Sequence, residues 1–497
     1  MVSFNLILDS WIPVRRSDDG PRIIRPDQIA EPGVIFPDWP RADLNIACLE
    51  LLIGLVFLAD PPANASDWRA RKPDAQRLRQ RLAPLAPAFN LTGEGPRFLQ
   101  DLDPLEGEPN PPDMLFIDSA GDSAAGKNAD VMVRRGRYPA LDLPLAAMAL
   151  YTLQALAPAG GRGNRTSMRG GGPMVTLVDP GRGNLWDLVW ANVPDGKPAA
   201  PEVLPWMRPT YRSDADGSEV YPEGAHPAEA FFGMPRRLRL VSDDRVTGVV
   251  QRPYGQNYSR WLHPLTPYYR KKRGEEFLPV RLYPGMLGYR NWLGVVAELP
   301  NDDDDMHRRA KNVETYLRTR TMESQRQGGS IIVAGWAMKS GQATPLDFCL
   351  SRQPLLSLPP DTNLTLVAMI QSAESFSLAL RGALKVAAGE GSALEALREE
   401  FFAATQAPFE TGVGELLAGT PPTETAARWL RSMERAALSI FDRQALPGLD
   451  QQRPEAMQQI IGARKSLAAA FAGWGKLGRD AYSKLHLEPR PSRKEAA

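Results

Sequence analysis

Short runs of β-branched and aliphatic residues, separated by prolines and glycines, recur through the first 360 positions of the chain. Such runs predict strands joined by turns. The clearest lie at residues 4–8, 174–178, 238–241 and 331–333. Two longer stretches, 44–58 and 140–156, carry apolar residues at helical spacing and predict helices. This part of the chain is therefore predicted to mix helices and strands.

The pattern becomes helical after Asp361. Apolar residues recur three and four positions apart in segments separated by glycines and prolines, at 362–384, 394–402, 426–441 and 457–474. Amphipathic helices with short connections pack through their apolar faces into a bundle. The sequence thus predicts an α+β fold, with a large mixed α/β domain with long loops at 1–360 and a C-terminal four-helix bundle at 361–497.

Long irregular loops are expected near 100–137, 158–173, 180–230 and 300–328. Loops of that length in a folded chain are usually functional or disordered. The chain has 59 Lys and Arg against 58 Asp and Glu. This balance excludes a polycationic protein that wraps nucleic acid by bulk charge. Any contact with nucleic acid therefore has to come from local basic patches.

The two cysteines, Cys48 and Cys349, lie in apolar stretches and are predicted to be core thiols. No CxxC pair is present, which argues against a cysteine zinc site. We identify no basic segment followed by an apolar one at the N-terminus, and no run of roughly 18 apolar residues. These features predict a cytoplasmic protein that does not enter a membrane.

Candidate catalytic groups are few. The four histidines are far apart, and the acidic run 302–305 is more typical of a solvated loop than of a metal site. Residues 121–128 nearly spell a Walker A loop, but Asn128 stands where the motif needs a Ser or Thr hydroxyl to bind Mg²⁺. We therefore predict no enzyme, metal or cofactor; a nucleotide hydrolase using this loop is the less favoured alternative.

Residues 158–173 form the segment richest in glycine and arginine, with six glycines and three arginines. Glycine lets the backbone approach a groove or a phosphate closely, and arginine supplies the opposite charge. A flexible surface loop with incidental charge explains the composition equally well.

Two further segments carry features of a DNA-binding protein. In residues 252–273, aromatic and basic residues alternate, which suits base stacking and phosphate contact but also ordinary packing. Residues 335–345 are predicted to form a turn after a buried strand, with Gln342 at its tip. A glutamine there could wedge into a base stack, although glutamine in a polar turn is more often plain surface.

These segments, in this order, resemble CasA, the large subunit of the type I-E CRISPR Cascade surveillance complex. The resemblance covers nearly the whole chain, including the helical C-terminus. It is carried by the opening segment 5–14, the stretch 115–118, the end of the glycine-rich loop at 169–173, the segment 261–264, and the pair Gly335-Trp336.

The resemblance implies a non-catalytic protein that reads the PAM, the short duplex beside the target, while guide RNA reads the target itself. Its glycine loop corresponds to Gly160, Gly161, Arg162 and Gly163. Its wedge, which starts strand separation, corresponds to Gly341, Gln342 and Ala343. The nearest candidate for its basic finger is Arg252. A nucleic-acid-contacting loop beside Phe116 would include Lys127 and Asn128.

The implied partners are the guide-RNA ribonucleoprotein formed with the other Cascade subunits, target double-stranded DNA, the displaced single strand, and the helicase–nuclease of the pathway. Arg428, Arg431 and Arg435 share one helix face that could meet the displaced strand or simply face solvent. Unlike some relatives, the chain has no four-cysteine zinc motif, and residues 338–341 differ from the paired asparagines of other members. A structural scaffold without direct DNA contact is the main alternative.

Overall fold

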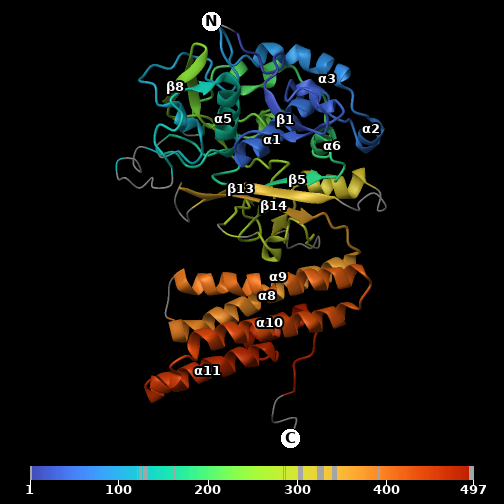
Figure 1. Ribbon diagram of the computed structural model, residues 1–497, viewed down its shortest axis with the longest axis vertical. Coiled ribbons are helices and arrows are strands. Elements are labelled where there is room, and N and C mark those ends of the chain that lie inside the picture. Colours follow the sequence, from blue (N-terminus) through green and yellow to red (C-terminus); the bar gives the residue numbers. More distant parts are fainter. Residues whose placement is uncertain are drawn as a thin grey trace. The chain divides into compact units, whose positions relative to one another are not determined.

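The computed structural model describes residues 3–491 apart from 120, 122–125, 127–132, 162, 216, 284, 286, 300–305, 322–328, 339–343 and 389–391. The chain forms two compact units. Unit 1 comprises Met1–Gly285 and Asp304–Leu355, and unit 2 comprises Met286–Asp303 and Leu356–Ala497. Unit 1 mixes strands and helices while unit 2 is helical, which confirms the predicted fold class (Figure 1).

Unit 1 is built on several small sheets rather than one large one. Its strands are β1 (Ile12–Arg16), β2 (Ile23–Ile24), β3 (Val34–Pro37), β4 (Leu141–Asp142), β5 (Val175–Asp179), β6 (Glu219–Val220), β7 (Arg237–Ser242), β8 (Arg245–Arg252), β9 (Asn257–Tyr258), β10 (Tyr268–Tyr269), β11 (Leu278–Pro279), β12 (His307–Arg308), β13 (Ser330–Met338) and β14 (Pro345–Pro354). The described three-stranded sheets have the orders β2-β1-β3, β11-β10-β12, β14-β13-β5 and β4-β8-β7, and β6 pairs with β9.

The strand β13 is the centre of its sheet, antiparallel to both β14 and β5. Its residues are buried without alternation, as in strands covered on both faces. The predicted strands at 174–178, 238–241 and 331–333 are confirmed. The turn that was predicted to begin at residue 335 begins later. The strand β13 continues to Met338, because Trp336 pairs with Phe348 of β14.

The strand predicted at residues 4–8 is wrong. Leu6 to Leu8 form a turn in which the Asn5 side-chain oxygen accepts the N–H groups of Ile7 (3.0 Å) and Leu8 (3.1 Å). Asn favours such local turns over a strand ladder because its side chain bonds the nearby backbone.

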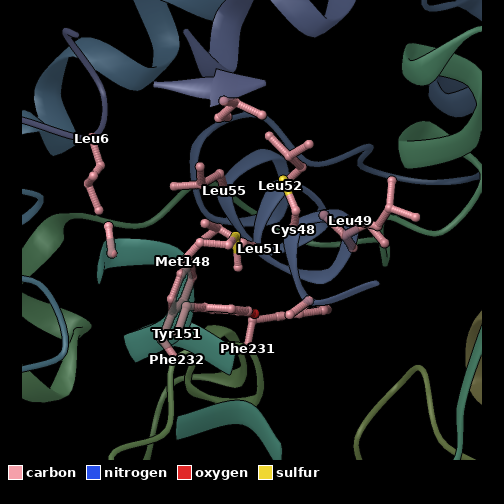
Figure 2. Close-up of a cluster of buried hydrophobic side chains, with 14 of the residues drawn as sticks. Leu6, Cys48, Leu49, Leu51, Leu52, Leu55, Met148, Tyr151, Phe231 and Phe232 are labelled. Atoms are coloured by element: carbon pink, nitrogen blue, oxygen red, sulfur yellow. The ribbon is translucent and has the colours of Figure 1, made fainter. Parts of the chain in front are cut away.

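The helices of unit 1 are α1 (Ala42–Ala59), α2 (Ala65–Ala70), α3 (Ala75–Leu82), α5 (Leu143–Leu156), α6 (Leu185–Trp190) and α7 (Lys311–Thr315). The predicted helices at 44–58 and 140–156 are confirmed as α1 and α5, which pack together. Figure 2 shows the core between them, where Cys48, Leu51 and Leu55 of α1 lie near Met148 and Tyr151 of α5. Burial raises the pKa of the Cys48 thiol to about 12.

Helix α1 bears on the expectation that the chain has no run of roughly 18 apolar residues. Among the described residues it alone is long and apolar enough to cross a membrane by length and composition. However, 89% of it is buried inside unit 1, and it carries the charged Glu50 in its middle. We therefore interpret α1 as the core helix of unit 1.

In its described residues, unit 2 contains four long helices, as predicted, and a shorter fifth one. They are α8 (Pro360–Ala388), α9 (Ser392–Leu417), α10 (Pro422–Ala445), α11 (Pro454–Phe471) and α12 (Gly475–Lys484). Figure 1 shows α8 to α11 running alongside one another. Trp429 of α10 donates to the Met369 carbonyl of α8 (3.0 Å), and Phe376 of α8 stacks on Phe471 of α11 (4.1 Å between ring centroids).

The segment Met286–Asp303 was assigned from sequence to the N-terminal domain, and the structure corrects this. Tyr289 stacks on Phe409 of α9 (4.3 Å), and its hydroxyl bonds Thr405 (2.8 Å). This ring is fully buried. The segment therefore completes the core of unit 2, although Asp304–Leu355 of unit 1, about 50 residues, separates it from the bundle in sequence.

Candidate nucleic-acid interface

The glycine-rich loop 158–173 connects α5 to β5 and is closed at its base. Ser167 donates its N–H to the Ala157 carbonyl (2.9 Å). A side-chain carbon at Gly171 would lie 3.2 Å from the Cα of Pro158, so the outgoing and incoming chains touch there. The two ends of the loop are therefore held together at its base.

The tip of the loop, from Gly160 to Asn164, is a tight turn. Asn164 donates its N–H to the Gly161 carbonyl (3.1 Å) and its side-chain amide to the Gly160 carbonyl (2.9 Å). Gly161 has φ +83° and is exposed with open space around it. Glycine is required there by the backbone conformation, and position 161 itself carries no side chain that would keep a ligand from the backbone. Arg162 lies outside the described residues.

The chain around Arg252 bonds this tip, whereas the Arg252 guanidinium itself lies against Gly107. Arg252 ends β8, and its neighbours on both sides bond the loop: Tyr254 donates its N–H to the Gly163 carbonyl (2.6 Å), and Gln251 donates to the Asn164 side chain (2.6 Å). A side-chain carbon at Gly163 would lie 2.6 Å from Pro253. The predicted glycine tip, which begins at Gly160, and the segment that contains Arg252 are 92 positions apart in sequence but adjacent in the fold.

The predicted wedge residues Gly341, Gln342 and Ala343 lie outside the described residues, but the strands that lead into and out of them are described. Met338, the last residue of β13, pairs with Pro345 of β14. The glycine-rich loop packs against this end of β13, because a side-chain carbon at Gly172 would lie 2.7 Å from the Met338 Cγ. The wedge segment thus starts from a strand end that packs against the loop.

One arginine of the loop does not have the role predicted for it. Arg169 is 2% exposed and pairs with Glu50 of α1 (Nη2–Oε1 2.7 Å), so it is closed to nucleic acid. Arg165 donates to the side chain and carbonyl of Ser213 (both 2.8 Å). These two arginines fix the loop to unit 1, and the prediction that they supply charge to a ligand is wrong for Arg169.

Arg169, Glu50 and His263 form a buried network at the base of the loop. The His263 Nε2 lies 3.5 Å from the same Glu50 oxygen that Arg169 contacts. Burial and the adjacent Arg169 charge lower the pKa of His263 to about 4. Burial opposes ionisation of Glu50, but the Arg169 charge and the contact with His263 outweigh it and lower the Glu50 pKa below its usual value. At neutral pH the network is thus an arginine–glutamate pair with a neutral imidazole.

The low pKa of His263 predicts a pH-dependent stability of unit 1. The folded state binds fewer protons than the unfolded state between the unfolded pKa of about 6.5 and the folded pKa of about 4, so stability falls as the pH falls through that window, by about 3 kcal/mol. His263→Asn should remove this contribution. Urea unfolding from pH 7 to 4 measures it, and parallel curves for wild type and variant would contradict the assignment.

Two aromatic rings of the segment 252–273 serve packing, one of the two alternatives left open by the sequence. The Tyr258 hydroxyl accepts the Met234 N–H (2.9 Å) and donates to Glu229 (3.0 Å). Trp261 is 7% exposed and donates its indole N–H to the Val220 carbonyl (2.9 Å). Both rings are anchored in unit 1, and the buried Trp261 is closed to stacking with bases.

Phe116 is a packing anchor beside the predicted nucleic-acid-contacting loop. Its ring is 2% exposed and stacks on Tyr138 (4.6 Å between centroids). The guanidinium groups of Arg41 (5.0 Å) and Arg137 (5.4 Å) lie over it, and both bond Asp118. Lys127 and Asn128 lie outside the described residues, as does most of the Walker-like loop 121–128, so their predicted roles stay predictions.

Among the described residues, no three His, Cys, Asp or Glu side chains gather in a group that could hold a metal ion. The acidic run 302–305 lies outside them. In its described part, unit 1 thus offers the exposed glycines of the loop tip, the half-buried Arg252, and the strand end that leads to Gln342.

Comparison with known proteins gives a consistent result. A sequence model of CRISPR-associated protein Cse1 matches residues 5–440. Among solved structures, CasA (Cse1) from Thermus thermophilus is 20% identical with a TM-score of 0.69, covering 94% of this chain and 99% of that one. Cse1 from Thermobifida fusca is 17% identical with a TM-score of 0.69, covering 97% and 98%.

A chain of a CRISPR RNA-guided surveillance complex is also similar, at 16% identity and a TM-score of 0.71, covering 94% of this chain and all of that one. These likenesses show a shared fold, and the match of the family over most of the sequence goes further. The chain belongs to the CRISPR-associated protein Cse1 family.

Proposed function

We propose that this chain is a non-catalytic subunit of a CRISPR RNA-guided surveillance complex, in which it recognises the PAM and starts to open the target duplex. The observation that carries the proposal is that the loop 158–173, which bears the Gly160–Gly163 tip, packs both against the residues that flank Arg252 and against Met338 at the end of β13. Similar chains in surveillance complexes support the assembly, since one of them is part of such a complex.

The chemistry of the region suits a duplex read from the minor groove. The bare backbone at Gly161 lets the chain approach base edges without a side-chain clash. The minor groove distinguishes A·T from G·C pairs but little more, so a short and degenerate motif is expected. Arg252 offers a charge to a phosphate or a groove edge: the described residues hold no carboxylate paired with it. Its guanidinium lies over Gly107, which has no side chain to displace it.

Gln342 would act after this first contact, as a wedge between base pairs. Gln342→Ala should slow opening of the target strands roughly tenfold or more, because unstacking costs a few kcal/mol and the alanine cannot replace the displaced base contacts. Assembly with the guide complex should be unchanged. Thr344→Ala, at the adjacent exposed position, is the matched control.

Strand opening is measured by fluorescence of 2-aminopurine placed beside the PAM. Equal opening rates for Gln342→Ala and wild type would remove Gln342 from the mechanism.

Unit 2 is proposed to contact the other subunits and the displaced strand, and the subunit as a whole to receive the helicase–nuclease in the cytoplasm. On α10, Arg428 is paired with Glu415 (3.0 Å), whereas Arg431 and Arg435 are exposed. The latter two are the better candidates for the displaced strand. A scaffold without DNA contact would give no salt-dependent contribution of its own to DNA binding by the complex.

A further inference from the structure

The side chain directly beneath the glycine tip is a buried arginine, Arg236. It precedes β7 and is 5% exposed. Its backbone is fixed by Gln154 of α5, which accepts the Arg236 N–H (3.0 Å) and donates to its carbonyl (2.9 Å). The guanidinium therefore points to the tip from a rigid support rather than from a flexible surface position.

The Arg236 guanidinium touches the loop at two points. Its Nη2 donates to the Pro158 carbonyl, and a side-chain carbon at Gly160 would overlap its Nη1. Gly160 itself is exposed. The charge thus lies against the backbone of a surface glycine, and any other residue at 160 would force it away.

This charge has no counter-ion among the described residues. No carboxylate pairs with Arg236, and its buried Nε has no hydrogen-bond partner. Burial lowers the Arg236 pKa to about 10, still well above neutral, so the group stays charged. The next residue, Arg237, is different, since it pairs with Asp101 (2.6 Å). A buried charge without a partner is costly to a fold, and its retention points to a partner that arrives from outside.

We propose that Arg236 provides the counter-charge for a backbone phosphate of bound nucleic acid, seated on the outer face of Gly160 and Gly161. This inference rests on the proposed function of the loop and adds the ligand group and the residue that holds it. A phosphate suits the site because it is an anion with several acceptor oxygens and because it contacts every sequence alike. Arg236 would thus add affinity for any sequence, while the backbone at Gly161 and the side chain of Gln342 would contact the base pairs.

The test uses the assembled complex and a short duplex carrying the PAM. Arg236→Gln should make the slope of log K against log [salt] less steep by about 0.9, the contribution of one phosphate. Affinity at low salt should fall about tenfold, equally for duplexes with and without the PAM. Thermal unfolding of the isolated subunit should show no loss of stability, because an unpaired buried charge has been removed.

Two further variants make the result decisive. Arg236→Met keeps the apolar stem and carries the test if the Gln variant does not assemble. Arg245→Gln removes the same charge from an exposed arginine that is already paired with Asp142 (2.9 Å), and it should leave the slope unchanged. An unchanged slope in both Arg236 variants, or an equal change in Arg245→Gln, would overturn the inference. PAM-specific binding that survives in those variants but not in Gly161→Asp would leave the proposed function intact.

Discussion

Gly161→Asp is expected to weaken binding of the assembled complex to PAM-containing DNA roughly 100-fold. The substitution places a negative charge on the exposed outer surface of the tip, where like-charge contact with a phosphate or base edge costs several kcal/mol. It also puts a side chain at φ +83°, which adds about 1–2 kcal/mol of local strain. Gel shift or interferometry at a fixed salt concentration measures the loss.

The chain offers a close control for this variant. Gly183 is also exposed, with φ +71° and open space around it. Gly183→Asp therefore introduces the same charge and similar strain elsewhere in unit 1. It should leave DNA binding within about twofold of wild type, since an exposed charge away from the DNA is screened. If both variants bind alike, the glycine tip has no special relation to DNA.

Arg169→Met is expected to lower the free energy of unfolding of unit 1 by about 3–5 kcal/mol, because it leaves the carboxylate of Glu50 buried without its partner. The base of the glycine-rich loop loses its anchor at the same time. DNA binding should therefore weaken although Arg169 never touches the ligand. Denaturant unfolding of the isolated subunit, followed through tryptophan fluorescence, gives the stability change.

The double variant Glu50→Leu/Arg169→Met separates charge from packing. With both charges removed, most of the lost stability should return, since well-packed apolar residues commonly replace a buried ion pair at little cost. If Arg169→Met alone lowers the free energy of unfolding by less than about 1 kcal/mol, as expected for an exposed ion pair, the network does not support the loop.

Much of the architecture is predictable because local patterns and final structure agree. The apolar run around Ile331 forms β13, and the helical spacing after Asp361 forms the bundle. Helix α12 was not predicted, because Gly475 and Gly478 look like turn residues. Gly478 instead permits close packing, since a side-chain carbon there would lie 2.5 Å from the Ala470 carbonyl oxygen of α11. This contact between Gly478 and Ala470 forms only in the folded protein, so the sequence pattern does not reveal it.

The candidate site was predictable in its position but not in its electrostatics. Glycine content marked the loop at 158–173, and the resemblance marked Gln342 and Arg252. Nothing in the sequence separates Arg169, which is buried against Glu50, from an arginine that meets a ligand. Likewise Arg236 and Arg237 are neighbours of the same type, and only the structure shows that Arg237 is paired and Arg236 is not. Ion pairing depends on contacts between distant positions, which local patterns do not contain.

The account depends on one arrangement, in which the glycine tip and the amide at position 342 meet the same short stretch of duplex. Photocrosslinking measures this directly, with a photoreactive residue placed at 161 or at 342 in the complex bound to target DNA. We expect both positions to crosslink to neighbouring base pairs at and directly beside the PAM. Crosslinks from the two positions to separate regions of the DNA, or none from position 161, would contradict it.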